Sequence, residues 1–332
     1  MSKYQGYLIE EKEGAYKGSI QTISTPEIED NHLIINVEYS SLNYKDALSA
    51  SGPKSGVTRN YPFVPGIDAV GKVTQSMSDR FNVGDEVIVT GYSMGMSVYG
   101  GFGEIIHVPA NWAAKLPSNL TPKEAMSYGT AGLTAAASVK KIIDSGIDKD
   151  KPILVSGATG GVGSVAVNIL NKLGYEVHAI TGKTTENEFL KTIGASAVVL
   201  RNEFMENPIR PLDKSIYGGA VDTVGGDILA KIISMTAPKC SVSACGNVAG
   251  MELNTSVFPF ILRGVSLIGI DSAESEIEFK ESIWDLLAGE WKVNLEDSTK
   301  SISLNALGDE IKKILNGKQV GRIVIKLSLI HI

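Results

Sequence analysis

Short apolar segments, bounded by turn-forming residues, dominate the first third of the chain. Their content of β-branched and aromatic residues is typical of strands, and glycine, proline, asparagine and aspartate separate them. The predicted strands cover residues 7–10, 33–41, 69–75, 86–90 and 104–109, and a short helix is expected at 44–50. We therefore expect a compact, β-rich unit in this part of the chain.

The pattern changes near Pro122, where helical and strand-like segments begin to alternate. A helix is expected over 122–134, because Thr121 can cap it, Pro122 stands at its first position and Glu124 follows in its first turn. Further helices are predicted over 164–173, 228–236 and 276–287, and strands over 153–156, 177–181, 197–200, 220–223, 241–245 and 265–270. Strands that alternate with helices indicate an α/β fold with a doubly wound parallel sheet.

The end of the chain differs from both preceding parts in its pattern of apolar residues. One more amphipathic helix is predicted from the spacing of Leu307, Ile311, Ile314 and Leu315. A closing strand is expected over 320–327, and the apolar tail at 328–332 carries no motif. These changes divide the chain into residues 1–121, 122–290 and 291–332.

Composition narrows the classes of function. The net charge is −6, so the chain has no overall basic footprint for nucleic acid. No apolar run is long enough to span a membrane, and the first residues lack the apolar stretch of a signal peptide, so we expect a cytoplasmic protein. No G-x-S-x-G motif supports hydrolase chemistry.

No metal site is expected either. The chain has two cysteines and four histidines, too few cysteines for a four-cysteine zinc site, and no histidine stands at a metal-binding spacing from another ligand. Cys240 precedes the strand predicted at 241–245 and Cys245 ends it, and we expect both to be small buried hydrophobic residues.

The strongest local motif is a glycine-rich turn between a predicted strand and a predicted helix. Residues 153–164 read I-L-V-S-G-A-T-G-G-V-G-S, with Ala158 at the first glycine position of the usual G-x-G-x-x-G pattern. Glycines allow the backbone to turn and approach a pyrophosphate, and the N–H groups of the following helix face the anion. The motif predicts a dinucleotide site; the alternative is a glycine-rich turn that binds nothing.

The end of the second strand of this unit indicates which dinucleotide is bound. An NAD site usually has an acidic residue here to hold the ribose 2′-hydroxyl. The chain instead reads Thr181, Gly182, Lys183, and the first acid is Glu186. Hydroxyl groups and a lysine suit a 2′-phosphate, so NADPH is the expected cofactor. The alternative for Lys183 is a solvated loop residue.

Five further segments are distinctive: S-S-L-N-Y-K-D-A at 40–47, Y-P-F-V-P-G-I-D at 61–68, G-T-A-G at 129–132, V-D-T-V-G at 221–225 and P-F-I-L-R-G-V-S-L-I-G-I-D-S at 259–272. Together they resemble one zinc-free branch of the medium-chain dehydrogenase/reductase superfamily, the quinone oxidoreductase/acrylyl-CoA reductase branch. The resemblance extends from Tyr4 to Lys326.

The resemblance implies a domain organisation. It implies a GroES-like catalytic domain at 1–121, a Rossmann NADP-binding domain at 122–290, and a segment at 291–332 that returns to the catalytic domain. It also implies an active site in the cleft between the domains, and a homodimer joined through sheet edges at 265–270.

The resemblance also implies site residues. The pyrophosphate would be held by Thr159, Gly160, Gly161, Val162 and Gly163. The 2′-phosphate side would be held by Thr181, Gly182, Lys183 and Arg201. The remaining cofactor contacts, mostly at the nicotinamide end, would come from Tyr44, Thr130, Asn247, Ile261, Ser272 and Arg322.

The sequence departs from the superfamily's zinc enzymes at two ligand positions. Those enzymes have a cysteine where Asn43 stands and a histidine where Ile67 stands, so no catalytic zinc is expected. The loop over 91–101 is also less polar than is usual in the family, which affects the expected substrate more than the cofactor.

The expected reaction is the NADPH-dependent reduction of the carbon–carbon double bond of a short α,β-unsaturated acyl-CoA such as acrylyl-CoA. Asn43 and Tyr44 are the candidate donors to the oxygen that gains enolate charge, and Asp46 is a supporting residue or a helix-start residue. Tyr44 could instead position the nicotinamide while water protonates the α-carbon. Two alternatives remain for the whole protein: a quinone or enone reductase, and an NADPH-binding structural protein without turnover.

Overall fold

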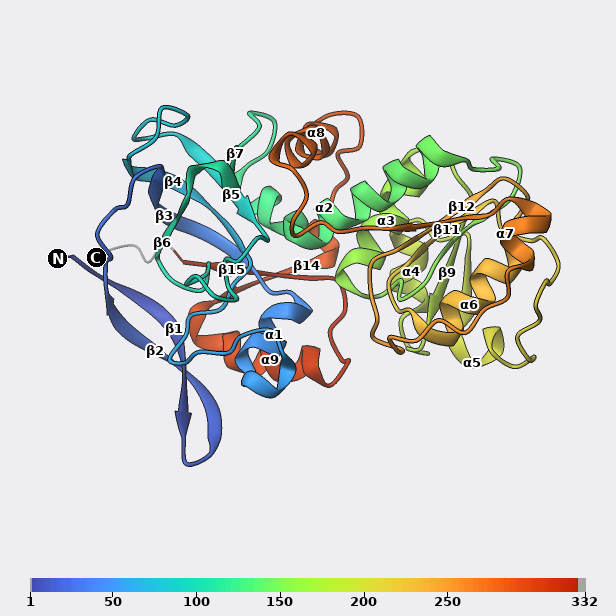
Figure 1. The fold of residues 1–332 in the computed structure, drawn as a ribbon, viewed down its shortest axis with the longest axis horizontal. Coiled ribbons are helices and arrows are strands. Elements are labelled where there is room, and N and C mark those ends of the chain that lie inside the picture. The colour runs from blue at the N-terminus through green and yellow to red at the C-terminus, as the bar shows by residue number, and fades with distance from the viewer. Residues whose placement is uncertain (1, 328–332) are drawn as a thin grey trace. The chain divides into compact units, whose positions relative to one another are not determined.

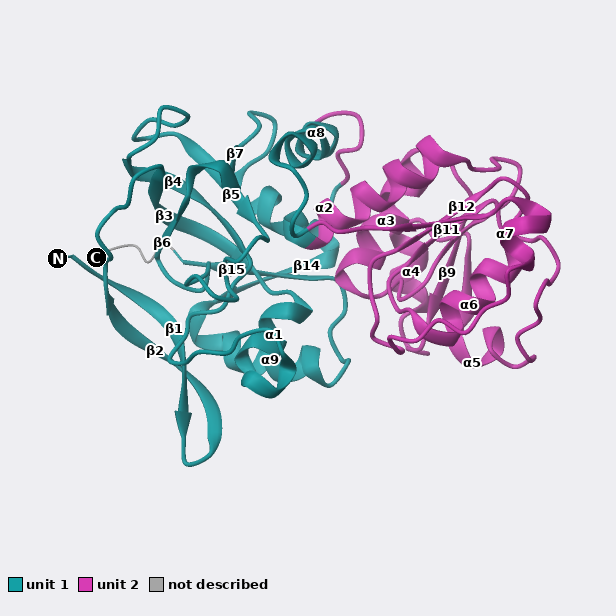
Figure 2. Ribbon diagram, in the orientation of Figure 1, with its two compact units in different colours: residues 1–130, 273–288, 294–332 teal, residues 131–272, 289–293 magenta. Residues whose placement is uncertain are grey.

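The computed structural model describes residues 2–327, so the tail at 328–332, for which no motif was found, lies outside the described residues. These residues form two compact units (Figure 2). The first contains residues 2–130, 273–288 and 294–327, and the second contains residues 131–272 and 289–293. The boundary between the units therefore lies within a helix, near residue 130, and the helix at 277–288 belongs to the first unit. The ranges expected from the sequence placed the boundary at residue 121 and this helix in the second domain.

The first unit is built around a seven-stranded sheet of mostly antiparallel strands (Figure 1). The strand order is β14-β15-β3-β4-β5-β7, and β6 also pairs with β3. The strands are β3 (His32–Ser41), β4 (Asp68–Ser76), β5 (Glu86–Thr90), β6 (Ile105–Pro109), β7 (Ala113–Lys115), β14 (Thr299–Ser303) and β15 (Arg322–Lys326). Their inward side chains, among them Leu33, Ile35 and Ile323, form one buried apolar cluster.

A two-stranded antiparallel hairpin, β1 (Lys3–Lys12) and β2 (Ala15–Ser24), completes the β structure of this unit. Neither β2 nor β14 was predicted. Both are mostly polar and partly exposed: the sequence of β14 is T-K-S-I-S, in which only Ile302 is buried. Such strands form because a neighbouring strand supplies hydrogen bonds, and their own apolar pattern gives little signal.

Helices of the first unit lie beside this sheet. They are α1 (Tyr44–Ala50), α8 (Ile277–Ala288) and α9 (Leu307–Leu315), and α2 (Pro122–Ser145) begins here. Residues of the C-terminal segment enter the buried cluster through Leu307, Ile311 and Ile325. The segment after residue 294 therefore folds as part of the first unit.

The second unit is a six-stranded parallel sheet in the order β10-β9-β8-β11-β12-β13. In order along the chain these are β8 (Ile153–Val155), β9 (Val177–Thr181), β10 (Ala197–Leu200), β11 (Gly219–Asp222), β12 (Ser241–Ala244) and β13 (Ser266–Gly269). Counted along the chain, the order is 3-2-1-4-5-6, the arrangement of a dinucleotide-binding fold. The connecting helices are α3 (Gly161–Lys172), α4 (Asn187–Thr192), α5 (Arg201–Phe204), α6 (Gly226–Met235) and α7 (Phe258–Arg263).

The structure thus confirms the predicted fold class, a β-rich GroES-like part together with a doubly wound parallel sheet. The central strand β8 carries Ile153, Leu154 and Val155, all fully buried, as expected for a parallel strand covered on both faces. Between residues 2 and 327, no helix combines the length and apolar character that a membrane crossing requires.

Candidate active site

The glycine-rich turn has the geometry of a phosphate-binding loop. It runs from the end of β8 to α3, with Gly157 at a φ of 60° and Gly160 at the N-cap of the helix. No side chain caps this helix, so the N–H groups of its first turn are not covered by a side-chain oxygen. A side chain on Gly163 would collide with the Gly157 carbonyl oxygen. The loop therefore fits a pyrophosphate at Thr159, Gly160, Gly161, Val162 and Gly163.

The residues predicted for the 2′-phosphate also lie together, at the end of β9. The Thr181 hydroxyl accepts a hydrogen bond from the backbone N–H of Lys183 at 3.0 Å, and lies 3.5 Å from the Thr159 hydroxyl. The guanidinium of Arg201 lies against Gly182, where an added Cβ would be 3.1 Å from it. Partial burial lowers the pKa of Lys183, while the charge of Glu186 opposes that shift. Two cations thus lie at the position where an NAD site usually has a carboxylate.

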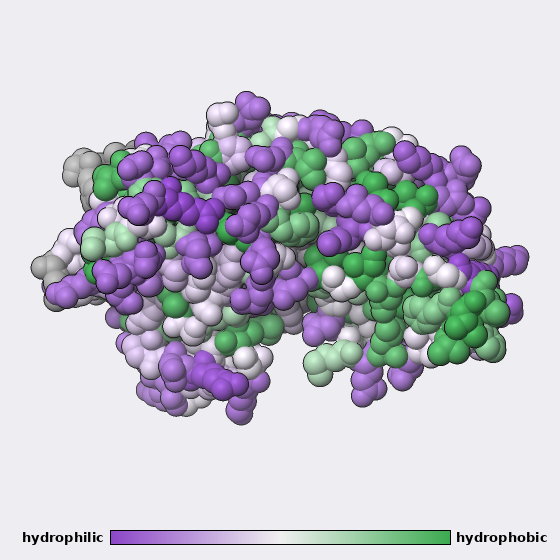
Figure 3. Space-filling view, turned by 45° about the horizontal axis from the view of Figure 1, so that its top comes forward, coloured by the Kyte–Doolittle hydropathy of each residue, from purple (hydrophilic) through white to green (hydrophobic). Residues whose placement is uncertain are grey.

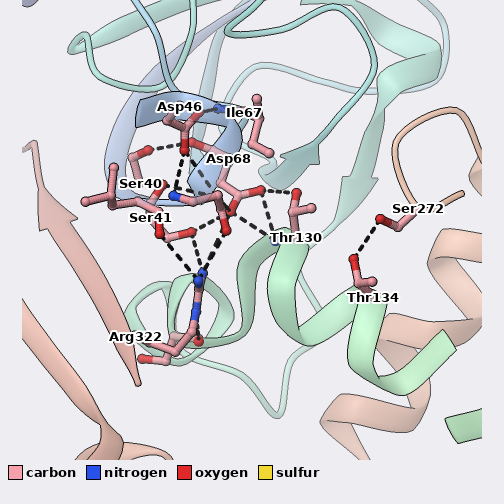
Figure 4. A network of polar contacts seen from close by, with 12 residues as sticks. Ser40, Ser41, Asp46, Ile67, Asp68, Thr130, Thr134, Ser272 and Arg322 are labelled. Atoms are coloured by element: carbon pink, nitrogen blue, oxygen red, sulfur yellow. Dashed lines mark hydrogen bonds and ion pairs between the residues drawn. The ribbon is translucent and has the colours of Figure 1, made fainter. Parts of the chain in front are cut away.

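Three further residues predicted at the nicotinamide end lie elsewhere in the second unit. Ser272 accepts a hydrogen bond from the Thr134 hydroxyl at 2.7 Å (Figure 4). Asn247 is exposed, and its carbonyl accepts the Gly250 N–H at 3.1 Å. Ile261 lies on α7, and 68% of its surface is exposed.

A buried polar network in the first unit is centred on Asp68, the first residue of β4 (Figure 4). Its carboxylate is fully buried and accepts a 2.7 Å hydrogen bond from the Asn43 amide and another from the Ser41 hydroxyl. The backbone N–H of Thr130 donates to both oxygens, at 2.9 and 3.0 Å, and the Thr130 hydroxyl donates at 2.5 Å. The Arg322 guanidinium lies 4.0 Å away. Asp68 is thus surrounded by donors.

Strand pairing brings this network together. β3 lies between β15 and β4 in the sheet, with Val324 of β15 opposite Ser41 of β3, so the ends of three strands meet. The sequence motif P-G-I-D contains Asp68, but nothing in its spacing predicted that distant donors would surround this residue. Ser41 was missed for the same reason.

Gly129 allows α2 to approach the network. Its φ of 51° and ψ of −156° interrupt the helix. A side chain here would collide with the Asp68 carboxylate and the Ser41 hydroxyl, and would come within 2.8 Å of Arg322. The helix resumes at Thr130, so Asp68 caps the start of the second helical stretch with a negative charge, where the helix dipole favours one.

Asp46 holds the start of α1. Its carboxylate accepts the backbone N–H groups of Asn43 and Ile67, each at 2.8 Å, and completes a capping box with Asn43. Burial, followed by the charge of Asp68, raises the pKa of Asp46 to about 7, although its hydrogen bonds oppose the shift. Asp46 therefore has the helix-start role, with no contact that would make it a catalytic acid.

Asn43 does not offer its amide to a substrate. Its Nδ2 atom donates to Asp68 at 2.7 Å and lies 3.3 Å from Asp46, and its Oδ1 atom accepts a 3.2 Å hydrogen bond from Arg322. The expectation that Asn43 donates to an enolate is therefore corrected. The reason is partly local and partly tertiary, because Asp46, three residues along the chain, and Asp68 of β4 take up its N–H groups.

Arg322 is also corrected. It was expected to contact the cofactor, but it is 1% exposed. Its guanidinium donates to the Ser127 carbonyl at 3.0 Å, to the Ser41 hydroxyl at 2.8 Å and to Asn43. Removing Arg322 from water lowers its pKa, while Asp68 and Asp46 oppose the shift. Its role is to hold the buried network.

Tyr44 differs from these neighbours, since 40% of its surface is exposed at the first position of α1. Within residues 2–327, no hydrogen bond of its phenol is found. Of the predicted oxyanion donors, Tyr44 is therefore the one whose proton is not committed to the network. No group of three or more histidine, cysteine, aspartate or glutamate side chains arranged for a metal ion occurs in that part of the chain.

Comparison with known proteins places the chain in a family. The alcohol dehydrogenase GroES-like domain model matches residues 29–118, and the zinc-binding dehydrogenase model matches residues 161–289. The acrylyl-CoA reductase AcuI of Ruegeria pomeroyi is 38% identical over 96% of this chain and 97% of its own length. YhfP of Bacillus subtilis, named as a quinone oxidoreductase, is 42% identical over 93% of this chain and 94% of its own. The chain belongs to the medium-chain dehydrogenase/reductase superfamily.

Solved structures of this superfamily agree with that assignment. The structure of Escherichia coli YhdH with bound NADPH has a TM-score of 0.93 and 39% identity, and the matched region covers 98% of this chain and 100% of that one. The structure of Bacillus subtilis yhfP with NAD bound has a TM-score of 0.95 and 40% identity, with the same coverage. The predicted resemblance is thus confirmed, and the chain is an oxidoreductase.

Proposed function

We propose that the protein reduces the carbon–carbon double bond of a short α,β-unsaturated acyl-CoA, with acrylyl-CoA as the first candidate, using NADPH. The observation that carries the proposal is the uncommitted, 40% exposed Tyr44 beside a network that occupies the donors of Asn43. Such a phenol can donate a hydrogen bond to a thioester oxygen without a metal. The acyl-CoA class is supported by the relative from Ruegeria pomeroyi named acrylyl-CoA reductase.

NADPH is the proposed cofactor because Lys183 follows β9 and the guanidinium of Arg201, the first residue of α5, lies against Gly182. Related structures hold different dinucleotides: that of Escherichia coli YhdH has NADPH and that of Bacillus subtilis yhfP has NAD. In this chain, the absence of an acid before Glu186 removes the usual partner of the ribose 2′-hydroxyl and favours a phosphate.

The proposed division of labour follows from the side chains. When bound, NADPH supplies a hydride for the substrate β-carbon. Tyr44 donates a hydrogen bond to the carbonyl oxygen as negative charge builds there, and water delivers the proton to the α-carbon. No metal takes part, because Asn43 and Ile67 stand where the zinc enzymes of the superfamily have ligands.

The test is an assay of the purified protein with NADPH and acrylyl-CoA, with propionyl-CoA measured as the product. We expect turnover, and Tyr44→Phe should lower kcat about a hundredfold while NADPH affinity stays nearly unchanged, because one oxyanion donor is lost. If Tyr44 only positions the nicotinamide with its ring, Tyr44→Phe will be tolerated and Tyr44→Ala will not. Rapid reduction of a quinone without any propionyl-CoA would overturn the acyl-CoA proposal.

That last outcome defines the second candidate, a quinone or enone reductase. It is supported by the similarity to YhfP, named as a quinone oxidoreductase, and by the weakly polar loop over 91–101. Both candidates use the same cofactor loop and Tyr44.

We also propose a homodimer joined through the second unit. β13 is the last strand of the six-stranded sheet, so among the described residues its outer edge pairs with no further strand. Apolar side chains gather on the surface of this unit (Figure 3), and those of Val257, Phe258, Ile261 and Leu262 are exposed. A free sheet edge beside an apolar patch is typical of a surface that pairs with a second copy.

A further inference from the structure

The segment V-D-T-V-G at 221–225 has no part in the site described so far, although it lies beside the phosphate loop. Asp222 ends β11, and Val221 of this strand is opposite Val155, which ends β8. The backbone N–H of Ser156, the first residue after β8, donates to the Val221 carbonyl at 3.0 Å. Ser156 and Asp222 therefore lie next to each other, at the carboxyl ends of two neighbouring parallel strands.

The chain leaves these two strands in opposite directions. After β8 it continues through α3 to β9, which pairs with one edge of β8, and after β11 it continues through α6 to β12, on the other side of the pair. The loops after β8 and β11 therefore diverge from a common point. In open parallel sheets, ligands bind at the carboxyl ends of the strands where the order reverses in this way.

A buried hydrogen-bond network ties the two loops together. The Ser156 hydroxyl donates to Oδ1 of Asp222 at 2.6 Å and accepts the Thr223 backbone N–H at 2.9 Å. The Thr223 hydroxyl donates to the Ser156 carbonyl at 2.9 Å. Oδ2 of Asp222 accepts the Gly225 N–H at 2.8 Å. Ser156 and Asp222 are fully buried, so losing any one of these bonds would leave a partner without water to replace it.

The network reaches the phosphate loop at Gly157. This glycine follows Ser156, has a φ of 60°, and lies so close to Thr223 that an added Cβ would be 2.3 Å from the hydroxyl oxygen. On its other side the loop is held by the Ala158 N–H, which donates to the Ile180 carbonyl of β9 at 3.1 Å. The side-chain network therefore fixes the loop against β11, and a separate backbone bond fixes it against the strand that leads to the 2′-phosphate residues.

We propose that Asp222 is a positioning residue for the cofactor pyrophosphate, acting through Ser156 and Thr223 on the start of the glycine loop. The proposal rests on the proposed cofactor. Backbone N–H groups bind a phosphate most tightly when their directions are already fixed, because ordering a loop on binding costs free energy. Both oxygens of Asp222 accept hydrogen bonds within the network, so the carboxylate affects the ligand only through the loop.

The test compares the binding of NADPH with that of adenosine 2′-monophosphate, which carries a 2′-phosphate but no pyrophosphate. Calorimetric titration of the native protein, Ser156→Ala and Asp222→Asn measures both affinities. We expect each variant to bind NADPH about five- to thirtyfold more weakly, as the loss of one or two hydrogen bonds implies, and to bind adenosine 2′-monophosphate within about twofold of the native protein. Ser243→Ala is the matched control, since this buried hydroxyl of β12 donates to the Ala220 carbonyl at 3.4 Å, outside the network. It should leave both affinities unchanged.

The two other substitutions keep the volume of the side chain. Asp222→Asn replaces one acceptor oxygen by an N–H2 group, so it cannot accept from both Ser156 and Gly225. Thr223→Val, at a partly buried position, removes only the bond to the Ser156 carbonyl and should cause the same selective loss to a smaller extent. Melting temperatures show which variants fold, and Thr223→Val decides the question if a fully buried variant does not.

The proposal is overturned if the folded variants bind NADPH as tightly as the native protein. It is also overturned if they lose affinity for both ligands equally, because the network would then support only the fold of the second unit. A native protein that binds neither NADPH nor adenosine 2′-monophosphate would instead contradict the proposed cofactor, so the two failures are distinguishable.

Discussion

At the scale of single residues, charge and exposure separate the groups that can meet a ligand from those that hold the site. Lys183 follows β9, the guanidinium of Arg201 in α5 lies against Gly182, and Tyr44 is exposed at the start of α1. Asp46 is two residues from Tyr44 in the sequence, and Arg322 donates a hydrogen bond to the neighbouring Asn43. Both residues are buried and form hydrogen bonds within the protein. From residue type alone, all three polar side chains were candidates for contact with a ligand.

Lys183→Glu should narrow or reverse the preference for NADPH over NADH. Replacing a cation by an anion beside the 2′-phosphate should weaken NADPH binding about ten- to a hundredfold and leave NADH binding nearly unchanged. Fluorescence titration with both dinucleotides measures this. Lys191→Glu, in the neighbouring helix α4, makes the same change of charge on an exposed surface and should have little effect. Equal NADH and NADPH affinity in the native protein would contradict the assignment.

Asp46 predicts a pH dependence of stability. Its pKa is about 7 in the folded protein against a usual 3.8, so the folded state retains a proton that the unfolded chain releases between these values. This residue's contribution to the free energy of unfolding should therefore fall by about 1.4 kcal/mol per pH unit in that window, and level off above pH 7.

The check is urea unfolding of the native protein and of Asp46→Asn between pH 4 and pH 8. The variant should be less stable at low pH, because one acceptor of the capping box is lost, and the difference between the two proteins should shrink as the pH rises toward about 7. A difference that stays constant with pH would show that Asp46 does not titrate in this range.

At the scale of elements, strand pairing and one helix interruption build the network. β15, β3 and β4 bring Arg322, Ser41 and Asp68 together, and the kink in α2 adds Thr130. The capping box of α1 fixes Asn43 next to Tyr44. Each element was largely predictable from its own pattern, but their contacts were not.

Gly129→Ala should strongly destabilise the first unit. Its backbone lies in a region that is essentially restricted to glycine, at a cost of about 1–3 kcal/mol for other residues, and the methyl group would also collide with Asp68 and Ser41. Gly317→Ala is the matched control, since Gly317 has a φ of 66° and nothing within 4 Å of an added Cβ. We expect the melting temperature to fall far more for Gly129→Ala. Similar losses in the two variants would show that the collision is relieved at little cost.

At the scale of the whole molecule, the second unit combines the cofactor loop with an exposed apolar surface near its sheet edge. Leu262 is 64% exposed in α7, next in sequence to Ile261. In a monomer these side chains would remain in water at a cost of about 25 cal/mol for each Å² of apolar surface. The proposed dimer would cover them.

Leu262→Asp should shift the protein from dimer toward monomer, because a charge in an apolar interface is costly to bury. Light scattering with size-exclusion chromatography gives the molar mass of the native protein and the variant. Val83→Asp is the control, since Val83 is similarly exposed, at 68%, but belongs to the first unit. A native protein with the mass of one chain at micromolar concentration would rule out the dimer.

The sequence by itself determined the elements that have a strong periodic pattern and the motif whose chemistry is local. Each strand of the parallel sheet, the glycine loop before α3 and the segment Thr181–Lys183 after β9 is contained within a few consecutive residues, so its pattern can be recognised in the sequence. The polar strands β2 and β14 could not be predicted from the sequence, because their stability comes from the strands that they pair with.

Only the tertiary structure decided which polar residues face a ligand. The side chains of Asn43, Arg322 and Tyr44 can all donate hydrogen bonds, but the positions of Asp68 and Gly129 decide which of these donors are already occupied. A buried donor forms its hydrogen bond with an acceptor that lies next to it, and strand pairing between segments far apart in the chain determines which acceptor that is.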